Sequence, residues 1–354
     1  MPATPFGVTG QFIAIAPEAV YGTAPVAFNR VIPVRNDSWT PEIQEVGTDS
    51  FRPGRQAMVA DQTIQVPVGG TGNTECLIPN SGGFLLFRDL LDYWNPALAA
   101  VTDASSLKKL TLQTNGVGPL ASAVRSLSIM VGRVDQGQVR REAIYSGCVI
   151  TGWTFSAAIS EPVTLAIDWD WAQRTELTPS SEAAYTPPAL AKKVSGPYYA
   201  WRDFQLQVGG EKLSSVTSFT FTAAKALDTA LYALIADTLK DQPIRSGVPE
   251  YTASVEARMN AQTQALYANW GNDGDVGALV ATLTGREDLK SSGSDPKFTS
   301  FVLTTQAAKA NGQEPVATLD GIPTQSLDLQ IKDPYDGSSL AVAIEIIGAQ
   351  GAID

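Results

Sequence analysis

Two stretches of the chain share an alternation of apolar and polar residues. In residues 145–171, apolar side chains recur at every second position on both sides of a turn at Pro162, the period expected of a half-buried β-strand. In residues 319–347, a similar alternation flanks a loop with Pro334 and Gly337, where proline presets φ and glycine permits the exit from the turn. Each stretch therefore predicts a β-hairpin.

The two stretches also indicate an internal duplication. Gly321 follows Gly147 by 174 positions in a chain of 354 residues, and weaker matches between the halves occur in the same order. The sequence between the halves is rich in proline, which prevents regular structure and favours an extended connector. We predict a first domain over residues 1–178, a proline-rich linker over 179–197 and a second domain over 198–354.

Further periodic segments predict a chain that is mainly β with a few short helices. Apolar residues at helical spacing predict amphipathic helices over residues 81–94, 227–239 and 261–270. Alternating segments predict strands at residues 10–16, 30–35, 61–68, 107–113, 126–133, 204–208, 216–221 and 251–258.

Two irregular segments lie between the first strands. Residues 47–60 have no strong periodicity and contain the sequence Arg52, Pro53, Gly54 and Arg55, which predicts a long exposed loop suited to contacts. Residues 69–73 are rich in glycine but lack the Gly-Lys-Ser/Thr sequence of a phosphate-binding loop. We interpret them as a flexible connection between strands.

The amino-acid composition and the net charge exclude several classes of function. With 44% apolar and 17% charged residues, the chain is typical of a compactly folded protein. Its net charge of −11 argues against direct binding to nucleic acid, because phosphate contacts need clustered lysine and arginine. The absence of histidine excludes Ser-His-Asp triads, Cys-His pairs and the usual zinc sites. Cys76 and Cys148 are isolated in sequence, and we interpret them as buried free thiols.

Asp168 and Asp170 are the most suggestive candidates for chemistry. Their spacing is that of a metal-binding Asp-x-Asp pair, and paired carboxylates also serve in glycoside hydrolysis. No basic group is placed in sequence to complete a site, so we interpret the pair as part of an exposed polar face. The repeat places Glu345 opposite Asp170, which suggests a repeated acidic surface. We expect no catalytic, cofactor-binding or metal-binding residue, and no enzyme.

Targeting signals are not evident in the sequence. Residues 1–20 lack the basic and apolar regions of a secretory signal, and no continuous apolar run reaches the length that spans a membrane. We expect a soluble protein that neither enters a membrane nor is exported by such a signal.

Several motifs resemble the tail tube proteins of long-tailed bacteriophages. They are Glu18-x-x-Tyr21-Gly22-Thr23, the Tyr-Ser-Gly-Cys sequence at 145–148, the serine- and threonine-rich strands, and Gly-Ile-Pro-Thr-Gln-Ser-Leu-Asp-Leu at 321–329. The resemblance covers nearly the whole chain. It implies two tandem β-sandwich or barrel domains, each with a short flanking α-helix.

The resemblance also implies an assembly. Chains with two such domains close as a homotrimeric, pseudo-sixfold ring, with a homohexamer as the alternative, and the rings stack into a tube that conducts DNA during ejection. Expected partners are further copies of the chain, a tape measure protein, and tail terminator and initiator proteins, and no cofactor is expected. The expected location is the virion tail, assembled in the host cytoplasm.

Residue roles follow from this resemblance as expectations. Asp168, Asp170 and Glu345 are expected to face the lumen, where negative charge repels passing DNA. The Arg52–Arg55 loop is expected to make contacts between stacked rings. Two alternatives stay open: a tail terminator or neck ring protein of the same fold, and a carbohydrate-binding or hydrolytic β-protein.

Overall fold

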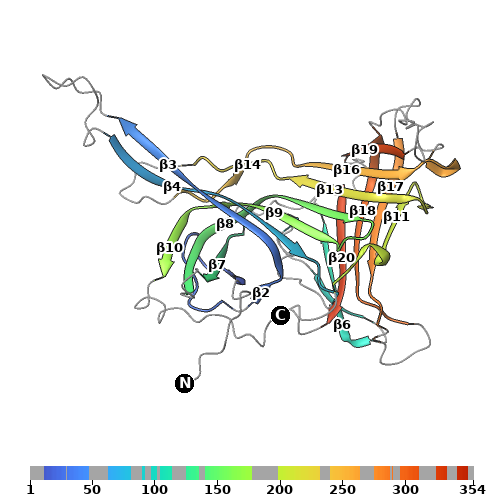
Figure 1. Cartoon of the computed structure of the whole chain (residues 1–354), viewed down its shortest axis with the longest axis horizontal. Helices are drawn as coiled ribbons and strands as arrows, with labels where there is room; N and C mark the ends of the chain where they lie inside the picture. The colour runs from blue at the N-terminus through green and yellow to red at the C-terminus, as the bar shows by residue number, and fades with distance from the viewer. Residues whose placement is uncertain are drawn as a thin grey trace, which may run out of the picture.

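The structure is a computed structural model, and almost all of its regular secondary structure is β, as predicted (Figure 1). It describes residues 12–28, 30–47, 63–80, 90–91, 97–101, 104–113, 125–134, 140–177, 198–231, 240–263, 275–287, 289, 296–310, 324–332 and 341–349. The strands before the proline-rich segment are β1 (Phe12–Pro17), β2 (Arg30–Ile32), β3 (Val34–Gly47), β4 (Thr63–Leu77), β5 (Ala97–Val101), β6 (Ala104–Gln113), β7 (Leu127–Val134), β8 (Arg140–Ala158), β9 (Thr164–Trp171) and β10 (Gln173–Leu177). The later strands are β11 (Phe204–Val208), β12 (Glu211–Leu213), β13 (Val216–Ala224), β14 (Leu227–Asp228), β15 (Ile244–Arg245), β16 (Glu250–Arg258), β17 (Asp275–Thr284), β18 (Ser300–Ala310), β19 (Thr324–Lys332) and β20 (Val342–Ala349).

The 19-residue strand β8 connects the two parts of the fold. Its first residues pair with β7 on one side and β10 on the other, and its later residues pair with β9 and with β13 of the second half. The first predicted hairpin is therefore confirmed, with Phe155 opposite Leu165 in the β8–β9 ladder.

The second predicted hairpin is wrong. Among the described residues, β19 pairs with β16 and β18, whereas β20 pairs with β18 and β6. Strands β19 and β20 pair with successive parts of β18, Ala307–Ala310 and Ser300–Thr305. Both run antiparallel to β18, so they follow one another in the same direction and do not form a hairpin. The alternation correctly located both strands, but it reports only which face is buried and contains no information on the pairing partner.

The two halves of the sequence share sheets and core. Besides the β8–β13 ladder, β6 of the first half pairs with β20 of the second. Phe155 stacks on Phe301 with ring centroids 5.4 Å apart and meets Phe219 edge-on at 6.0 Å. One apolar cluster, which includes all three rings, extends across both halves. The division into domains 1–178 and 198–354 stays a prediction, and the linker at 179–197 lies outside the described residues.

The predicted helices fall largely outside the described residues. Of residues 81–94 only Leu90 and Leu91 are described, and both are buried. The helix expected from Leu227 does not begin there, because Leu227 and Asp228 form β14 and pair with β15. Residues 261–263 are helical, and the rest of the helix expected there is not described. A short 3₁₀ helix spans Trp201–Asp203.

The glycine-rich residues 69–73 belong to strand β4, so their interpretation as a flexible connection is wrong. They pair with β3 on one side and, from Gly70, with β9 on the other. A Cβ at Gly70 would collide with the carbonyl of Thr40 and the ring of Trp171, and one at Gly72 would lie 2.5 Å from the ring of Trp39. Glycine is needed here because the strand passes directly beneath two indole rings.

The Glu18–Gly22 motif has a structural role. The Glu18 carboxylate accepts hydrogen bonds from the backbone N–H of Gly22 at 2.9 Å, the backbone N–H of Gly147 at 2.7 Å and the Ser128 hydroxyl at 2.6 Å. These bonds tie the segment after β1 to β7 and to the start of β8. The two cysteines are buried free thiols, as predicted.

Candidate functional site: a polar sheet face

Six neighbouring strands form one continuous antiparallel surface in the order β4, β9, β8, β13, β16 and β19. The order crosses from the first half of the sequence to the second at β8–β13, where seven residue pairs run from Ser218–Ala158 to Ala224–Gly152. This surface therefore combines strands from both halves of the chain.

One side of this surface faces the core and the other is polar. Residues directly opposite on adjacent strands point to the same side of a sheet. The buried rows contain rings such as Phe155, Phe219 and Phe221. The rows that point away contain Thr154, Thr222, Thr252 and Gln330 in one register, and Ser156, Thr220, Ser254 and Asp328 in the next.

Side-chain hydrogen bonds cross this polar face between strands. The Ser254 hydroxyl donates to Asp328 at 2.7 Å, and the Ser218 hydroxyl donates to Glu256 at 3.1 Å. The Thr154 and Thr222 hydroxyls lie 3.3 Å apart. These bonds hold the two carboxylates in place among the hydroxyl side chains of this face.

The exposed charge on this face is mainly negative. Asp168, Glu256 and Asp328 are all exposed, and Asp168 accepts a 2.7 Å hydrogen bond from the amide of Asn73 on β4. Within the described part of the face, the basic side chains are Arg258 and Lys332, the last residues of β16 and β19. The central rows therefore present hydroxyls and carboxylates.

Asp170 differs from the sequence prediction. It shares the β9 strand with Asp168 but is only 2% exposed, and its Oδ1 accepts a 2.5 Å hydrogen bond from Lys240 Nζ. Lys240 lies between β14 and β15 in sequence, and its side chain covers the Asp170 carboxylate. The exposure predicted for Asp170 is therefore wrong, because the covering residue lies 70 positions away in sequence.

Glu345 lies on another part of the sheet system. It is in β20, between β18 and β6, and pairs with Lys109 at 2.6 Å. The structure does not bring Glu345 into the same strand ladder as Asp168. The strand pairing therefore does not place Glu345 and Asp170 in equivalent positions of a repeated acidic surface.

Arg52, Pro53, Gly54 and Arg55 lie outside the described residues, between β3 and β4. The strands that lead to them form a two-stranded ribbon. The β4–β9 ladder ends at Gly70–Trp171, whereas the β3–β4 ladder continues to Gly47–Thr63. This ribbon projects from the body of the molecule (Figure 1).

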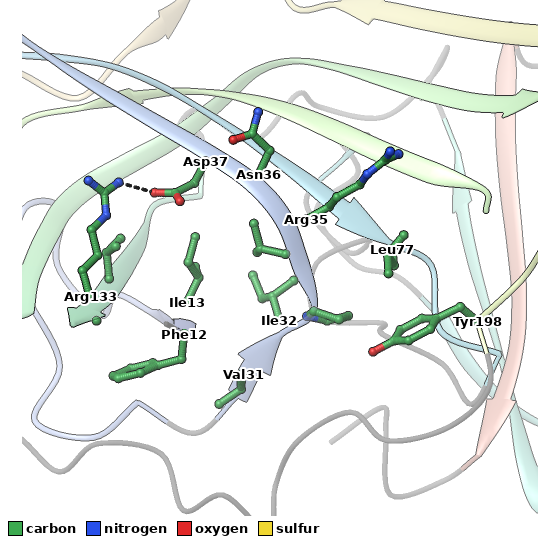
Figure 2. Close-up of a pocket in the computed structure, with 14 residues that line it drawn as sticks. Phe12, Ile13, Val31, Ile32, Arg35, Asn36, Asp37, Leu77, Arg133 and Tyr198 are labelled. Carbon is green, nitrogen blue, oxygen red and sulfur yellow. Dashed lines mark hydrogen bonds and ion pairs between the residues drawn. The ribbon is translucent and has the colours of Figure 1, made fainter. Parts of the chain in front are cut away.

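A groove of about 410 Å³ lies beside the base of this ribbon (Figure 2). Its lining is about equally polar and apolar and includes Phe12, Val31 and Leu77, with Tyr198 at one end. Arg133 pairs with Asp37 across the groove at 2.6 Å. The same carboxylate also accepts a 2.9 Å hydrogen bond from the Trp39 indole. The ion pair with Asp37 compensates the charge of Arg133 within the chain.

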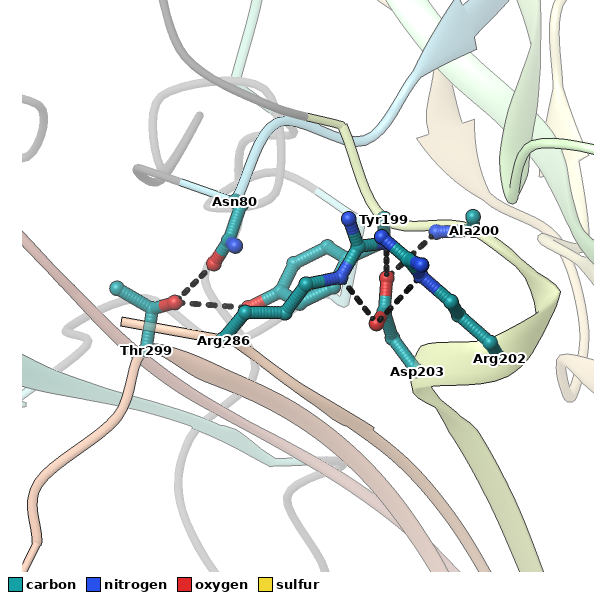
Figure 3. A network of polar contacts seen from close by, with 7 residues as sticks. All are labelled: Asn80, Tyr199, Ala200, Arg202, Asp203, Arg286 and Thr299. Atoms are coloured by element: carbon teal, nitrogen blue, oxygen red, sulfur yellow. Dashed lines mark hydrogen bonds and ion pairs between the residues drawn. The ribbon is translucent and has the colours of Figure 1, made fainter. Parts of the chain in front are cut away.

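A second polar network joins the halves near the 3₁₀ helix (Figure 3). Arg286 donates two hydrogen bonds to Asp203, at 2.7 and 2.5 Å, and the Ala200 N–H donates a third at 2.9 Å. Burial opposes the effect, but these bonds lower the pKa of Asp203 below its usual value. The Thr299 hydroxyl contacts Asn80 and Tyr199, and burial raises the pKa of Tyr199 to about 12.

Catalytic and metal-binding chemistry has little support in the described ranges. They contain no group of three or more Cys, Asp or Glu residues that could hold a metal ion. Burial raises the pKa of Cys76 to about 12 and that of Cys148 well above its usual value, so neither thiol is an accessible nucleophile. Over the same ranges, no helix is long and apolar enough to cross a membrane.

Sequence reasoning found Asp168 but missed the rest of the polar face. The alternating serine and threonine residues of β8, β13, β16 and β19 were visible as separate strands. Their union into one surface depends on the β8–β13 pairing, which has no local signal. Glu256 and Asp328 could have been found only once that register was known.

A comparison with protein families gives one match. The family model described as "Phage tail tube protein" matches residues 9–331, which contain every strand from β1 to β18 and nearly all of β19. A search of curated proteins gives no significant match.

Proposed function

Because the chain belongs to the phage tail tube protein family, and is therefore a structural component of the virion, we propose that its copies close into rings that stack as the wall of a tail tube. The tube is the conduit through which DNA is ejected into the host. The observation that carries this proposal is the continuous polar face of β4, β9, β8, β13, β16 and β19, which is backed by the core and spans both halves of the chain.

The polar face suits the wall of a DNA channel. Hydroxyl groups keep the surface hydrated, and the carboxylates of Asp168, Glu256 and Asp328 repel phosphate, so that DNA slides past without binding. Three chains with a net charge of −11 each give a ring with a net charge of −33, which adds to the repulsion of DNA. Glu345 is proposed as a further lumen residue. The Asp170 carboxylate is covered and pairs with Lys240, so it adds nothing to this exposed negative charge.

The β3–β4 ribbon suits contact between stacked rings. A two-stranded ribbon is marginally stable by itself in water, so a projecting one gains stability when a neighbouring subunit covers it. The Arg52–Arg55 loop at its tip supplies two guanidinium groups, which form strong charge-assisted bonds with carboxylates. Axial contacts of this kind repeat without closing and therefore build a filament.

The ring is proposed to contain three chains, with six as the alternative. A chain with duplicated tube domains presents two wall segments, and three copies then complete a pseudo-sixfold ring. The tape measure protein and the tail terminator and initiator proteins are the proposed partners at the lumen and at the ends of the tube.

Negative-stain electron microscopy and mass measurement of purified assemblies test this proposal. Long hollow tubes whose ring repeat has the mass of three chains are expected. Isolated rings that never stack would favour a terminator or neck protein instead, and monodisperse particles at high concentration would contradict ring formation. Deletion of residues 52–55 is expected to leave folded subunits that fail to form tubes, and tube formation by this variant would refute the role of the loop.

A further inference from the structure

The side chains of Lys240 and Asp170 form a buried contact between an amine and a carboxyl group. Their side chains are each 3% exposed, and Nζ lies 2.5 Å from Oδ1. The backbone N–H of the next residue, Asp241, donates to the carbonyl of Leu231 at 3.0 Å, which anchors the segment that presents Lys240. The amine is therefore held against the carboxyl group by the fold.

The residues described around this pair do not satisfy all of its hydrogen-bonding atoms. Asp170 Oδ2 has no hydrogen-bond partner among the described residues, and neither has the buried hydroxyl of Tyr21. The charge of Asp170 contributes, after burial, to raising the pKa of Tyr21, so the two groups are electrostatically coupled. A buried ion pair with an unsatisfied oxygen is costly, because desolvation of both ions is only partly offset by their attraction.

Burial favours the protonated form of the Asp170 carboxyl group. Burial raises the pKa of Asp170 even though the hydrogen bond and charge of Lys240 lower it. In a dry site, transfer of one proton from the ammonium group to the carboxylate leaves a neutral amine beside a carboxylic acid. These are the reactants of amide formation, and they are already held in contact, which replaces a bimolecular encounter by an intramolecular one.

We propose that Lys240 and Asp170 are joined by an intramolecular isopeptide bond in the folded chain. The lone pair of neutral Nζ attacks Cγ of the protonated carboxyl group and forms the N–C bond. The C–OH bond then breaks, and the hydroxyl leaves as water with a proton lost from the nitrogen. No oxidant, reductant or cofactor enters the balance.

The bond would fasten the second half of the chain to the first. It links β9 to the segment before β15 across 70 residues, at one end of the proposed lumen face. A covalent link of this kind protects a subunit against mechanical force along the tube axis, because the two linked segments stay joined even when the subunit partly unfolds.

The first test is the intact mass of the purified full-length protein. A mass about 18 Da below that of the sequence is expected, which is the loss of one water. A mass equal to that of the sequence overturns the proposal.

Peptide mapping identifies the residues from which the water molecule is lost. Trypsin does not cleave after an acylated lysine, so a branched species joining peptides 142–174 and 226–245 is expected. Succinimides at the Asp-Gly sequences 273–274, 320–321 and 336–337 would lose the same mass. A water loss confined to those positions, with peptides 142–174 and 226–240 recovered separately, also overturns the proposal.

Two variants serve as controls. Lys240→Arg keeps the positive charge but removes the primary amine, so its mass should match its sequence. Lys109→Arg alters the exposed Lys109–Glu345 pair, which is solvated at 39% and 36% side-chain exposure, and should retain the deficit of about 18 Da. If Lys240→Arg keeps the deficit, the assignment to Lys240 is wrong.

Discussion

Removal of the Phe155 ring tests whether the two halves of the chain form one cooperative unit. Phe155 is fully buried in β8, stacks on Phe301 and meets Phe219 edge-on, so its ring connects strands from both halves. Truncation of a buried phenylalanine to alanine costs about 3–5 kcal/mol, through lost burial and the cavity left behind. Each favourable aromatic pair adds about 0.5–1.5 kcal/mol, so we place Phe155→Ala toward the upper end of that range.

Urea unfolding of the unassembled subunit, followed by tryptophan fluorescence and far-ultraviolet circular dichroism, measures this change. Both signals are expected to show a single transition that shifts to lower urea by the same amount in the variant. Ile159→Ala, in the turn after the same strand, is the matched control, because Ile159 is 44% exposed and its loss should cost less than about 0.5 kcal/mol. A loss below about 1 kcal/mol for Phe155→Ala, or two transitions of which only one shifts, would refute the shared core.

Three further predictions follow from local geometry. Gly70→Ala should destabilise the subunit and lower its melting temperature, because the added methyl group collides with the Thr40 carbonyl and the Trp171 ring, whereas Ser254→Ala on the open face should change it little. Asp203→Asn should lower the melting temperature more at pH 7 than at pH 3. The depressed pKa of Asp203 gives stability that is fully present above its unfolded value of about 3.9 and is lost progressively as the pH falls through the folded value. The thiols of Cys76 and Cys148 should not react with a disulfide reagent at pH 8 until the chain is unfolded, and rapid reaction in the native state would contradict their burial.

The strands were predictable because each buries one face and so alternates in sequence. The β8–β9 hairpin followed directly, since its turn is short and its two strands pair with each other. The alternation of β19 and β20 is equally clear, but both strands pair with successive parts of β18 and not with each other. Periodicity reports burial, and the partner of a strand is decided by packing elsewhere in the chain.

Strand β4 was only partly predictable because glycine has no side chain to alternate. The sequence predicts a flexible connection at Gly70 and Gly72, whereas in the structure both glycines make room for the rings of Trp171 and Trp39. Both tryptophans lie far from them in sequence, so the requirement for glycine became visible only in the folded chain.

The candidate site was predictable to the extent that its residues act locally. Asp168 is exposed as its strand position suggested, whereas Asp170, two residues further on, is covered by Lys240 from the other half. The polar face as a whole required the β8–β13 register, which links segments about 65 residues apart. Pairing at such separations has no local signature in the sequence.

The position of the polar face in the assembled tube decides whether this face lines the DNA channel. A cryo-electron microscopy map of tubes formed by this chain, at a resolution that traces the strands, would show where β13, β16 and β19 lie. We predict that Thr220, Ser254 and Asp328 face the bore, with three chains around each ring. A map that places these side chains on the outer surface of the tube, or buries them between rings, would contradict it.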